Sequence, residues 1–307
     1  MRLVGMHDDQ LQVTVDTVRT LIGDQFPDLA ALPVARFPSE GTAHAIFRVG
    51  EDLAARFPLR PGDVDDGRQR LQAEADAARV LSRHTSVPVP APVALGDPGY
   101  GYPLSWSIQT WVPGRTASDV DTSSSAAFAH DLAEFIRQVR AIDVDGRGFA
   151  GVGRGGDLMS HDAWVEASLR ASDGIVDVTR LRAIWTRLRR LPRWEPDAMT
   201  HGDLIPGNVM VRDGRLTGVL DVGGLGPADP ALDLVAAWHL LDADRRQRFR
   251  VDLACDAIAW ERGKAWAFEQ AVGAVWYYAD TNPRMHRMGR QTLDRILADE
   301  GRHSGPW

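Results

Sequence analysis

His201-Gly-Asp203-Leu-Ile-Pro-Gly-Asn208 and, after the apolar residues 216–220, Asp221-Val-Gly223 are the stretches that decide the fold and the chemistry of this chain. Between them, Asp213-Gly214 predicts a tight turn that joins strands at residues 208–211 and 216–220. The pattern therefore predicts an Asp, an Asn and a second Asp at the ends of short strands. That arrangement suits a divalent metal beside a nucleotide phosphate.

Each of these polar residues receives a role in phosphoryl transfer. Asp203 is the candidate catalytic carboxylate, which orients an attacking hydroxyl or accepts its proton. Asn208 and Asp221 are the candidate metal ligands, because amide and carboxylate oxygens suit Mg²⁺. His201 is expected to support this loop by packing and hydrogen bonding rather than by chemistry.

Other interpretations of the stretch are weaker. Turn formation explains Asp203 or Asn208 singly, but not three polar groups around one predicted hairpin. The pairs Gly-Asp and Gly-Asn also resemble fragments of dinuclear metallophosphatase loops. Such sites need histidines after these pairs, and Leu204 and Val209 stand there instead.

The composition indicates a globular protein. With 307 residues, 44% hydrophobic and 25% charged, the chain can bury a core as one large or two ordinary domains. A net charge of -7 disfavours nucleic acid as a partner and is compatible with a cationic substrate. The single Cys255 favours a reducing, cytoplasmic setting, and no apolar run predicts a leader or a membrane partner. The sequence carries no signal for an oligomeric state.

The first third of the chain is predicted to be rich in strands. A helix is expected around residues 15–22, strands at 34–37, 43–49, 53–57 and 102–112, and a long helix at 68–84. The three short strands should form a small antiparallel sheet. Pro113-Gly114 ends the last strand and is the candidate hinge between two lobes.

The remainder is predicted to be mainly helical apart from the hairpin. Helices are expected at residues 123–142, 162–170, 179–191, 230–241, 245–260, 265–279 and 283–298. The expected organisation is an α+β chain with a nucleotide-binding lobe at 1–109, a hinge at 110–115 and a catalytic and substrate-binding lobe at 116–307.

Three motifs resemble one family. Residues 201–208, residues 216–223 and Asp229-Pro230-Ala231-Leu232-Asp233-Leu234 are similar to the Brenner-type motifs of the aminoglycoside phosphotransferase family. The resemblance covers the whole chain in order and length. It implies a bilobal protein-kinase-like fold, with a small antiparallel-sheet N-lobe and a larger, mainly helical C-lobe. It also implies Mg²⁺ as cofactor and ATP or GTP as phosphate donor.

The same resemblance assigns nucleotide-binding residues in the first lobe. The stretch Ser39-Glu40-Gly41-Thr42 takes the place of the family's phosphate-covering loop, which makes Ser39, Gly41 and Thr42 candidates. Arg56 stands where the family has a phosphate-binding lysine, and Glu74 matches its ion-pair partner. Arginine departs from the family pattern, but its planar, permanently charged fork can still bridge phosphate and carboxylate. The alternative is that Arg56 is a solvated residue of the strand and Glu74 a solvated residue of the helix.

The resemblance also implies that the hinge strand forms a second part of the nucleotide site. Backbone groups of Thr110 and Val112 should meet the adenine edge, and Trp106 and Trp111 could line the purine pocket, although a tryptophan there is more often core.

The acceptor is expected to be a small-molecule hydroxyl of an aminoglycoside-like antibiotic, with a macrolide or a metabolite as the alternative. A polycationic sugar would need several carboxylates around its pocket, whereas a macrolide would need a wide apolar cleft. The chain offers residues for both, but carboxylates on helices commonly belong to solvated faces, and aromatic residues at helical spacing commonly belong to the core. The candidate carboxylates are Asp157, Asp162, Glu166, Asp173, Glu195, Glu269 and Asp280. The candidate aromatic residues are Trp164, Trp266, Phe268, Trp276 and Tyr277. A nucleotide-binding pseudokinase is the alternative from another functional class.

Overall fold

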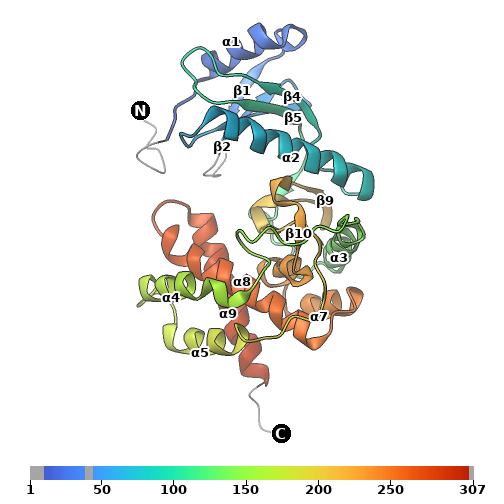
Figure 1. The fold of residues 1–307 in the computed structure, drawn as a ribbon, viewed down its shortest axis with the longest axis vertical. Helices are drawn as coiled ribbons and strands as arrows, with labels where there is room; N and C mark the ends of the chain where they lie inside the picture. The colour runs from blue at the N-terminus through green and yellow to red at the C-terminus, as the bar shows by residue number, and fades with distance from the viewer. Residues whose placement is uncertain (1–9, 39–43, 304–307) are drawn as a thin grey trace. The chain divides into compact units, whose positions relative to one another are not determined.

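The computed structural model describes residues 10–38 and 44–303, which form two compact units (Figure 1). The first unit comprises residues 1–83 and 88–113, and the second comprises 84–87 and 114–307. One is built on an antiparallel sheet and the other is mainly helical, so the predicted α+β class is confirmed. Among the described residues, we find no helix with the length and apolar character of a bilayer span.

A five-stranded antiparallel sheet, in the order β1-β2-β3-β5-β4, organises the first unit. Figure 1 shows α1 on one side of this sheet and α2 on the other. The elements are α1 (Val15–Gln25), η1 (Pro27–Leu29), β1 (Val34–Phe37), β2 (His44–Val49), β3 (Leu53–Pro58), α2 (Val64–His84), β4 (Pro92–Gly96) and β5 (Trp106–Thr110).

Alternation along the strands and one stripe of α1 build the core of this unit. In β2 every second residue is buried, and these residues pack with Leu21 and Ile22 of α1. Phe57 of β3 stacks on Trp106 of β5 with ring centroids 4.7 Å apart. Helix α1 begins at Thr14, whose hydroxyl accepts the backbone N–H of Thr17.

The predicted strand at 102–112 is too long, since β5 begins at Trp106. A turn precedes it, in which Tyr102 and Gly99 exchange backbone hydrogen bonds of 2.9 Å around the left-handed residues Tyr100 and Gly101. The hydroxyl of Tyr102 then donates to the carbonyl of Pro58 over 2.7 Å. The alternating pattern therefore reflects a buried tyrosine in a turn rather than a continuous strand.

The second unit carries its two small sheets among helices. Strands β6-β8-β9 form one sheet, and β7 pairs with β10 in the other. Its strands are β6 (Arg115–Thr116), β7 (Ala198–Thr200), β8 (Val209–Arg212), β9 (Arg215–Val219) and β10 (Gly226–Ala228). Its α-helices are α3 (Ala126–Arg140), α4 (Asp162–Ala171), α5 (Val178–Leu188), α6 (Val235–Leu240), α7 (Ala243–Asp252), α8 (Ala257–Tyr277) and α9 (Pro283–His303). Its 3-10 turns are η2 (Leu158–His161), η3 (Pro206–Asn208), η4 (Val222–Gly224) and η5 (Pro230–Leu234).

The predicted helices at 245–260 and 265–279 place a break at the wrong position. The chain leaves the helical conformation after α7, where Ala254 has a φ of 51° and the carboxylate of Asp256 accepts the N–H of Ala259 to begin α8. Helix α8 runs straight through Gly263. A Cβ atom there would lie 2.5 Å from Cβ of Leu234, so this glycine serves close packing.

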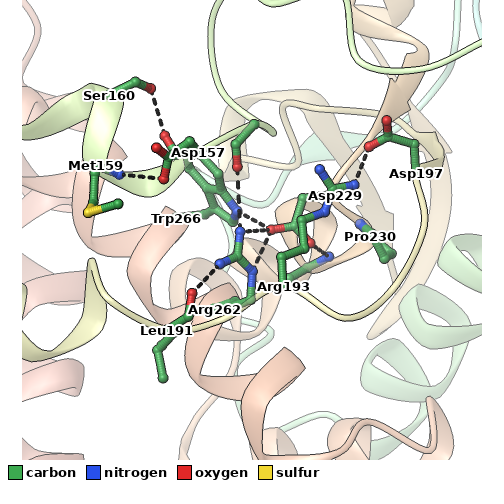
Figure 2. A network of polar contacts seen from close by, with 12 residues as sticks. Asp157, Met159, Ser160, Leu191, Arg193, Asp197, Asp229, Pro230, Arg262 and Trp266 are labelled. Atoms are coloured by element: carbon green, nitrogen blue, oxygen red, sulfur yellow. Dashed lines mark hydrogen bonds and ion pairs between the residues drawn. The ribbon is translucent and has the colours of Figure 1, made fainter.

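Buried polar contacts fix the segment between β10 and α6. Oδ2 of Asp229 accepts hydrogen bonds from Nη2 of Arg262 over 2.6 Å and from Nε1 of Trp266 over 3.0 Å, as Figure 2 shows. Oδ1 of Asp229 accepts the N–H of Ala231, which begins η5. Asp229 and Arg262 are both buried, so the ion pair anchors this segment to α8.

Candidate active site

The loop after β7 is held by a buried carboxylate. Asp233 accepts the backbone N–H of His201 over 2.8 Å and that of Gly202 over 2.9 Å. Gly202 has a φ of 84°, and a Cβ there would lie 3.2 Å from the carbonyl oxygen of Gly224. A glycine is therefore required at this position, and Asp203 follows it at a fixed place. Sequence motifs alone do not reveal this role of Asp233, because its two backbone partners lie more than 30 positions away.

His201 has the packing role expected of it. It is fully buried, and its ring lies edge-on to Phe135 with centroids 6.2 Å apart. Nε2 of His201 lies 3.2 Å from the carbonyl oxygen of Leu220, and Nδ1 accepts the N–H of Asp203 over 3.3 Å. A carbonyl can only accept and an N–H can only donate, so the proton resides on Nε2. The ring thereby ties the Asp203 loop to the end of β9.

The carboxylate of Asp203 accepts hydrogen bonds from three side chains. Oδ1 accepts hydrogen bonds from Nη2 of Arg154 over 3.2 Å and from Nε2 of Gln270 over 3.3 Å. Oδ2 accepts Nδ2 of Asn208 over 2.9 Å. Burial raises the pKa of Asp203 above its usual range, and the negative charge of Asp221 adds to the increase. The positive charge of Arg154 acts in the opposite direction and lowers this pKa.

Asn208 and Asp221 lie at the same end of the β8–β9 hairpin. Val209 pairs with Val219, and the N–H of Leu220 donates to the carbonyl oxygen of Asn208 over 2.8 Å. Asp221 follows directly, in a left-handed conformation with a φ of 56° and a ψ of 61°. Non-glycine residues rarely adopt this conformation, and Asp is one of the residues that tolerate it. The hairpin therefore brings both candidate metal ligands together.

The donors at this hairpin end fit a magnesium ion that is shared with phosphates. Both hydrogen bonds of the Asn208 side chain use Nδ2, which leaves Oδ1 as the atom for a cation. Among the described residues no group of three or more His, Cys, Asp or Glu side chains gathers as a metal site. Magnesium commonly takes one or two protein ligands and completes its shell with phosphates and water. The candidate ligands Asn208 and Asp221 make up a set of this size.

Arg154 is a site residue that the sequence analysis missed. It lies in the glycine-rich segment 151–156, where a Cβ at Gly155 would lie 2.6 Å from Cβ of Ala228. Besides Asp203, its guanidinium faces Glu269, with Nη1 and Oε2 3.8 Å apart. Within the described part of the chain, Nε of Arg154 and Oε2 of Glu269 are buried without a hydrogen-bond partner. The closely spaced glycines were the signal that could have drawn attention to this segment.

The first unit contains the ion pair expected between β3 and α2. Nη1 of Arg56 donates to Oε1 of Glu74 and lies 3.4 Å from Oε1 of Gln109. Arg56 is 7% exposed, which excludes the alternative of a solvated strand residue. Burial lowers the pKa of the neighbouring His44 to about 3, and the charge of Arg56 contributes to the decrease. The candidates Ser39, Gly41 and Thr42 lie outside the described residues.

Residues 110 and 111, in the predicted hinge, form backbone hydrogen bonds inside the first unit. The N–H of Thr110 donates to the carbonyl of Ala91 over 2.8 Å, and the N–H of Trp111 donates to that of Asp52 over 2.6 Å. The side chain of Trp106 is fully buried, and its Nε1 donates to the carbonyl of Asp97, so Trp106 is core and cannot line a purine pocket. Arg48 lies over the ring of Trp111, 4.1 Å from its centroid.

Several candidate acceptor carboxylates serve the protein's own structure. Asp162 pairs with Arg189, Glu166 pairs with Arg182, and Oε1 of Glu269 lies 3.0 Å from Nδ1 of His161. Asp157 accepts the N–H of Met159 at the start of η2. The carboxylates of Asp173, Glu195 and Asp280 belong to exposed residues.

The candidate aromatic residues divide into core and surface. Trp266 and Phe268 are fully buried, which excludes them from a cleft. Trp164 and Tyr277 are 41% and 39% exposed. Trp164 packs over Gly273, where a Cβ would lie 2.5 Å from its Cζ2 atom, and its ring centroid is 6.0 Å from that of Trp276.

Comparison with known proteins places the chain among phosphotransferases. Residues 34–266 match the model of the phosphotransferase enzyme family. An aminoglycoside 3'-phosphotransferase of Streptomyces fradiae is 33% identical over 187 residues, which cover 57% of this chain and 66% of that protein. The matched regions span between 53% and 66% of the curated relatives.

Solved structures of antibiotic phosphotransferases share the fold. The GDP and kanamycin complex of APH(2")-IIia is 18% identical, with a TM-score of 0.69 over 92% of this chain and 98% of that one. The macrolide 2'-phosphotransferase of Brachybacterium faecium is 19% identical, with a TM-score of 0.61 over 91% and 97%. At such identities the likeness establishes the kinase-like fold. The match to the family model covers most of the chain, which therefore belongs to the phosphotransferase enzyme family.

Proposed function

We propose that this protein transfers the γ-phosphate of ATP or GTP to a hydroxyl group of a small molecule. The observation that carries the proposal is the Asp203 carboxylate, held by Asn208 at the hairpin end that also bears Asp221. Asp203 orients the acceptor hydroxyl and takes its proton as the acceptor oxygen bonds to the γ-phosphorus, while the bond from that phosphorus to the β–γ bridging oxygen breaks and releases the nucleoside diphosphate. Its increased pKa suits a group that must accept a proton in the transition state.

Asn208 and Asp221 are the proposed ligands of Mg²⁺, through an amide oxygen and a carboxylate oxygen. When bound, this ion supplies positive charge to the phosphate oxygens of the donor nucleotide. The neutral amide of Asn208 leaves more of that charge for the phosphates than a second carboxylate would. His201 and Asp233 support both ligands indirectly, because they fix the loop between β7 and η3.

Arg56 is the proposed phosphate-binding residue of the first unit, with Glu74 as the partner that orients it. The loop residues Ser39, Gly41 and Thr42 are proposed to cover the phosphates. Adenine recognition is proposed for the backbone of Val112 and the carbonyl of Thr110, since the N–H of Thr110 already donates to Ala91. The names of related structures include GDP, ADP and ATP complexes, which supports a nucleoside triphosphate as donor.

An aminoglycoside is the first proposed acceptor, because the curated relatives include aminoglycoside 3'-phosphotransferases. A macrolide is the second, and one observation favours it. Three of the candidate carboxylates in the second unit already pair with Arg189, Arg182 and His161, whereas Trp164 and Tyr277 are exposed. A cytoplasmic location is proposed from the single cysteine.

An acceptor panel tests the function. Purified protein is incubated with Mg²⁺ and ATP or GTP, together with aminoglycosides, macrolides and small sugar alcohols, and phosphorylated products are identified by mass spectrometry. We expect one class to be phosphorylated at a hydroxyl. Nucleotide binding without transfer to any acceptor would instead favour a pseudokinase.

A further inference from the structure

A chain of hydrogen bonds joins the Asp203 carboxylate to the buried interior of the second unit. Nε2 of Gln270 lies 3.3 Å from Oδ1 of Asp203, and Oε1 of Gln270 lies 2.7 Å from Nε2 of His239. Nδ1 of His239 lies 2.9 Å from Oγ1 of Thr292. Gln270, His239 and Thr292 belong to α8, α6 and α9, so three helices hold the chain in place.

The Asp203 carboxylate determines which way the amide of Gln270 faces, because it can only accept a hydrogen bond. The amide oxygen of Gln270 can only accept, so Nε2 of His239 carries the proton and Nδ1 accepts from the hydroxyl of Thr292. This hydroxyl also lies 3.9 Å from Sδ of Met288, a weaker acceptor. If Gln270 were flipped, its amide oxygen would face the Asp203 carboxylate, and two acceptors would then oppose each other. The observed orientation is therefore favoured.

The environment of His239 preserves this arrangement. The residue is 3% exposed, and burial lowers its pKa to about 4. The ring is therefore neutral near pH 7 and keeps one donor and one acceptor nitrogen. Every donor in the chain then points towards Asp203, which allows successive hydrogen bonds to polarise one another.

The two oxygens of the Asp203 carboxylate differ in the hydrogen bonds that they accept. Oδ1 accepts from both Arg154 and Gln270, whereas Oδ2 accepts from Asn208 alone among these side chains. A carboxylate oxygen has two lone pairs, so Oδ2 keeps one for an acceptor hydroxyl. Gln270 and Asn208 together prevent rotation of the carboxylate about its χ2 torsion.

We propose that Gln270 is a positioning residue for phosphoryl transfer, which aims Oδ2 of Asp203 at the acceptor hydroxyl and is itself held in place by His239. The inference rests on the proposed phosphotransferase activity and adds a residue outside the motifs that identify the family. Gln270 acts through Asp203, with no contact to the reacting atoms required.

Gln270→Met tests the proposal, because methionine keeps the length of the side chain and removes its hydrogen bonds. We expect kcat for the acceptor identified in the panel to fall by about 10²-fold, as misplacement of a reacting group can cost. The affinity for nucleotide should stay close to that of the wild type, whereas the Tm should fall modestly, because the buried Nε2–H of His239 loses its acceptor. Gln247→Met, the same change at an exposed position of α7, is the matched control and should leave kcat unchanged.

A double-mutant cycle separates positioning from a general structural effect. In the Asp203→Asn background, Gln270→Met should cause no further loss of kcat, because the group that it aims has already been replaced. An unchanged kcat in the single variant, or an equal fold loss in both backgrounds, would overturn the inference while leaving the proposed function intact. If the wild type phosphorylates no acceptor, the proposed function fails and this inference fails with it.

Discussion

Nη2 of Arg154 lies 3.2 Å from Oδ1 of Asp203, so a positive charge from a glycine-rich segment faces the carboxylate proposed to accept the substrate proton. Burial and Asp221 raise the pKa of Asp203, and Arg154 counteracts them. The two side chains are 33% and 32% exposed, so solvent weakens this pair but does not cancel it. The protonation of Asp203 therefore depends on a residue far from it in sequence.

Arg154→Met should shift the acidic limb of the pH profile of kcat/KM to higher pH. Removing the guanidinium raises the pKa of Asp203, so the carboxylate becomes protonated and inactive at a higher pH as the solution is acidified. The profile measured over the range where nucleotide binding is constant checks this shift. Arg182→Met, which removes the surface partner of Glu166, is the control. A limb that does not move, or that moves to lower pH, would show that Arg154 does not control Asp203.

Asp203→Ala and Asp221→Ala should affect different steps. Asp203→Ala removes the proton acceptor, so transfer should fall by about 10²- to 10⁴-fold while nucleotide affinity is retained. Asp221→Ala removes a metal ligand, so nucleotide binding should also lose part of its dependence on Mg²⁺. Calorimetric titration of nucleotide with and without Mg²⁺ distinguishes the two variants. Small and equal effects of both changes would contradict the assigned roles.

The family motif predicted the residues of the hairpin because they are local in sequence. Asp203, Asn208 and Asp221 lie within 19 positions, and the β8–β9 turn alone brings the latter two together. Arg154 and Gln270 reach Asp203 from 49 and 67 positions away, and no spacing rule connects them. Their contribution depends on how α8 and the glycine-rich segment pack around β10.

The errors in the fold have a similar origin. Ala254 follows α7 in a left-handed conformation without the glycine that usually marks such a stop, so the end of α7 carried no signal and the start of α8 was marked by Asp256 alone. Trp106 is open between a purine pocket and the core on sequence grounds, and only the stacking of its ring on Phe57 assigns it to the core. Periodicity predicts that a face is buried, but tertiary packing decides what covers it.

Arg56→Ala should weaken nucleotide binding without unfolding the first unit. The guanidinium is proposed to donate to a phosphate, and the loss of a hydrogen bond between charged groups costs about 1.5–3 kcal/mol, or roughly a 10- to 100-fold increase in Kd. Arg68→Ala, which removes an exposed ion pair with Asp97 in the same unit, is a matched control. An unchanged Kd for Arg56→Ala would show that its pair with Glu74 is purely structural.

Arg262→Met should destabilise the second unit severely. It leaves the buried carboxylate of Asp229 without its charged partner, which costs about 3–5 kcal/mol. Urea unfolding followed by tryptophan fluorescence measures the loss. Adding Asp229→Asn should restore part of the stability, because the buried charge is then removed. A loss below about 1 kcal/mol, as for a surface pair, would refute this role.

His239 should make the second unit less stable in mild acid. Its pKa falls from an ordinary value of 6.5 to about 4 on folding, so the unfolded chain binds a proton below pH 6.5 that the folded chain does not. Stability is therefore retained above pH 6.5 and lost as the pH falls towards 4. Between about pH 7 and about pH 5 this residue should account for a loss of about 2 kcal/mol. His239→Gln should flatten the decline in Tm over this interval, and an identical decline in both proteins would contradict the assignment.

Transfer of a labelled γ-phosphate is the measurement that tests the central claim most directly. Wild-type protein and Asp203→Asn are each supplied with Mg²⁺, γ-labelled ATP or GTP and the acceptor panel, and the label is followed into the acceptor. We predict that the wild type labels a hydroxyl of one acceptor class and that Asp203→Asn binds nucleotide equally well but transfers at least about 10²-fold more slowly. Labelling of water alone by the wild type, or equal transfer by both proteins, would contradict the account.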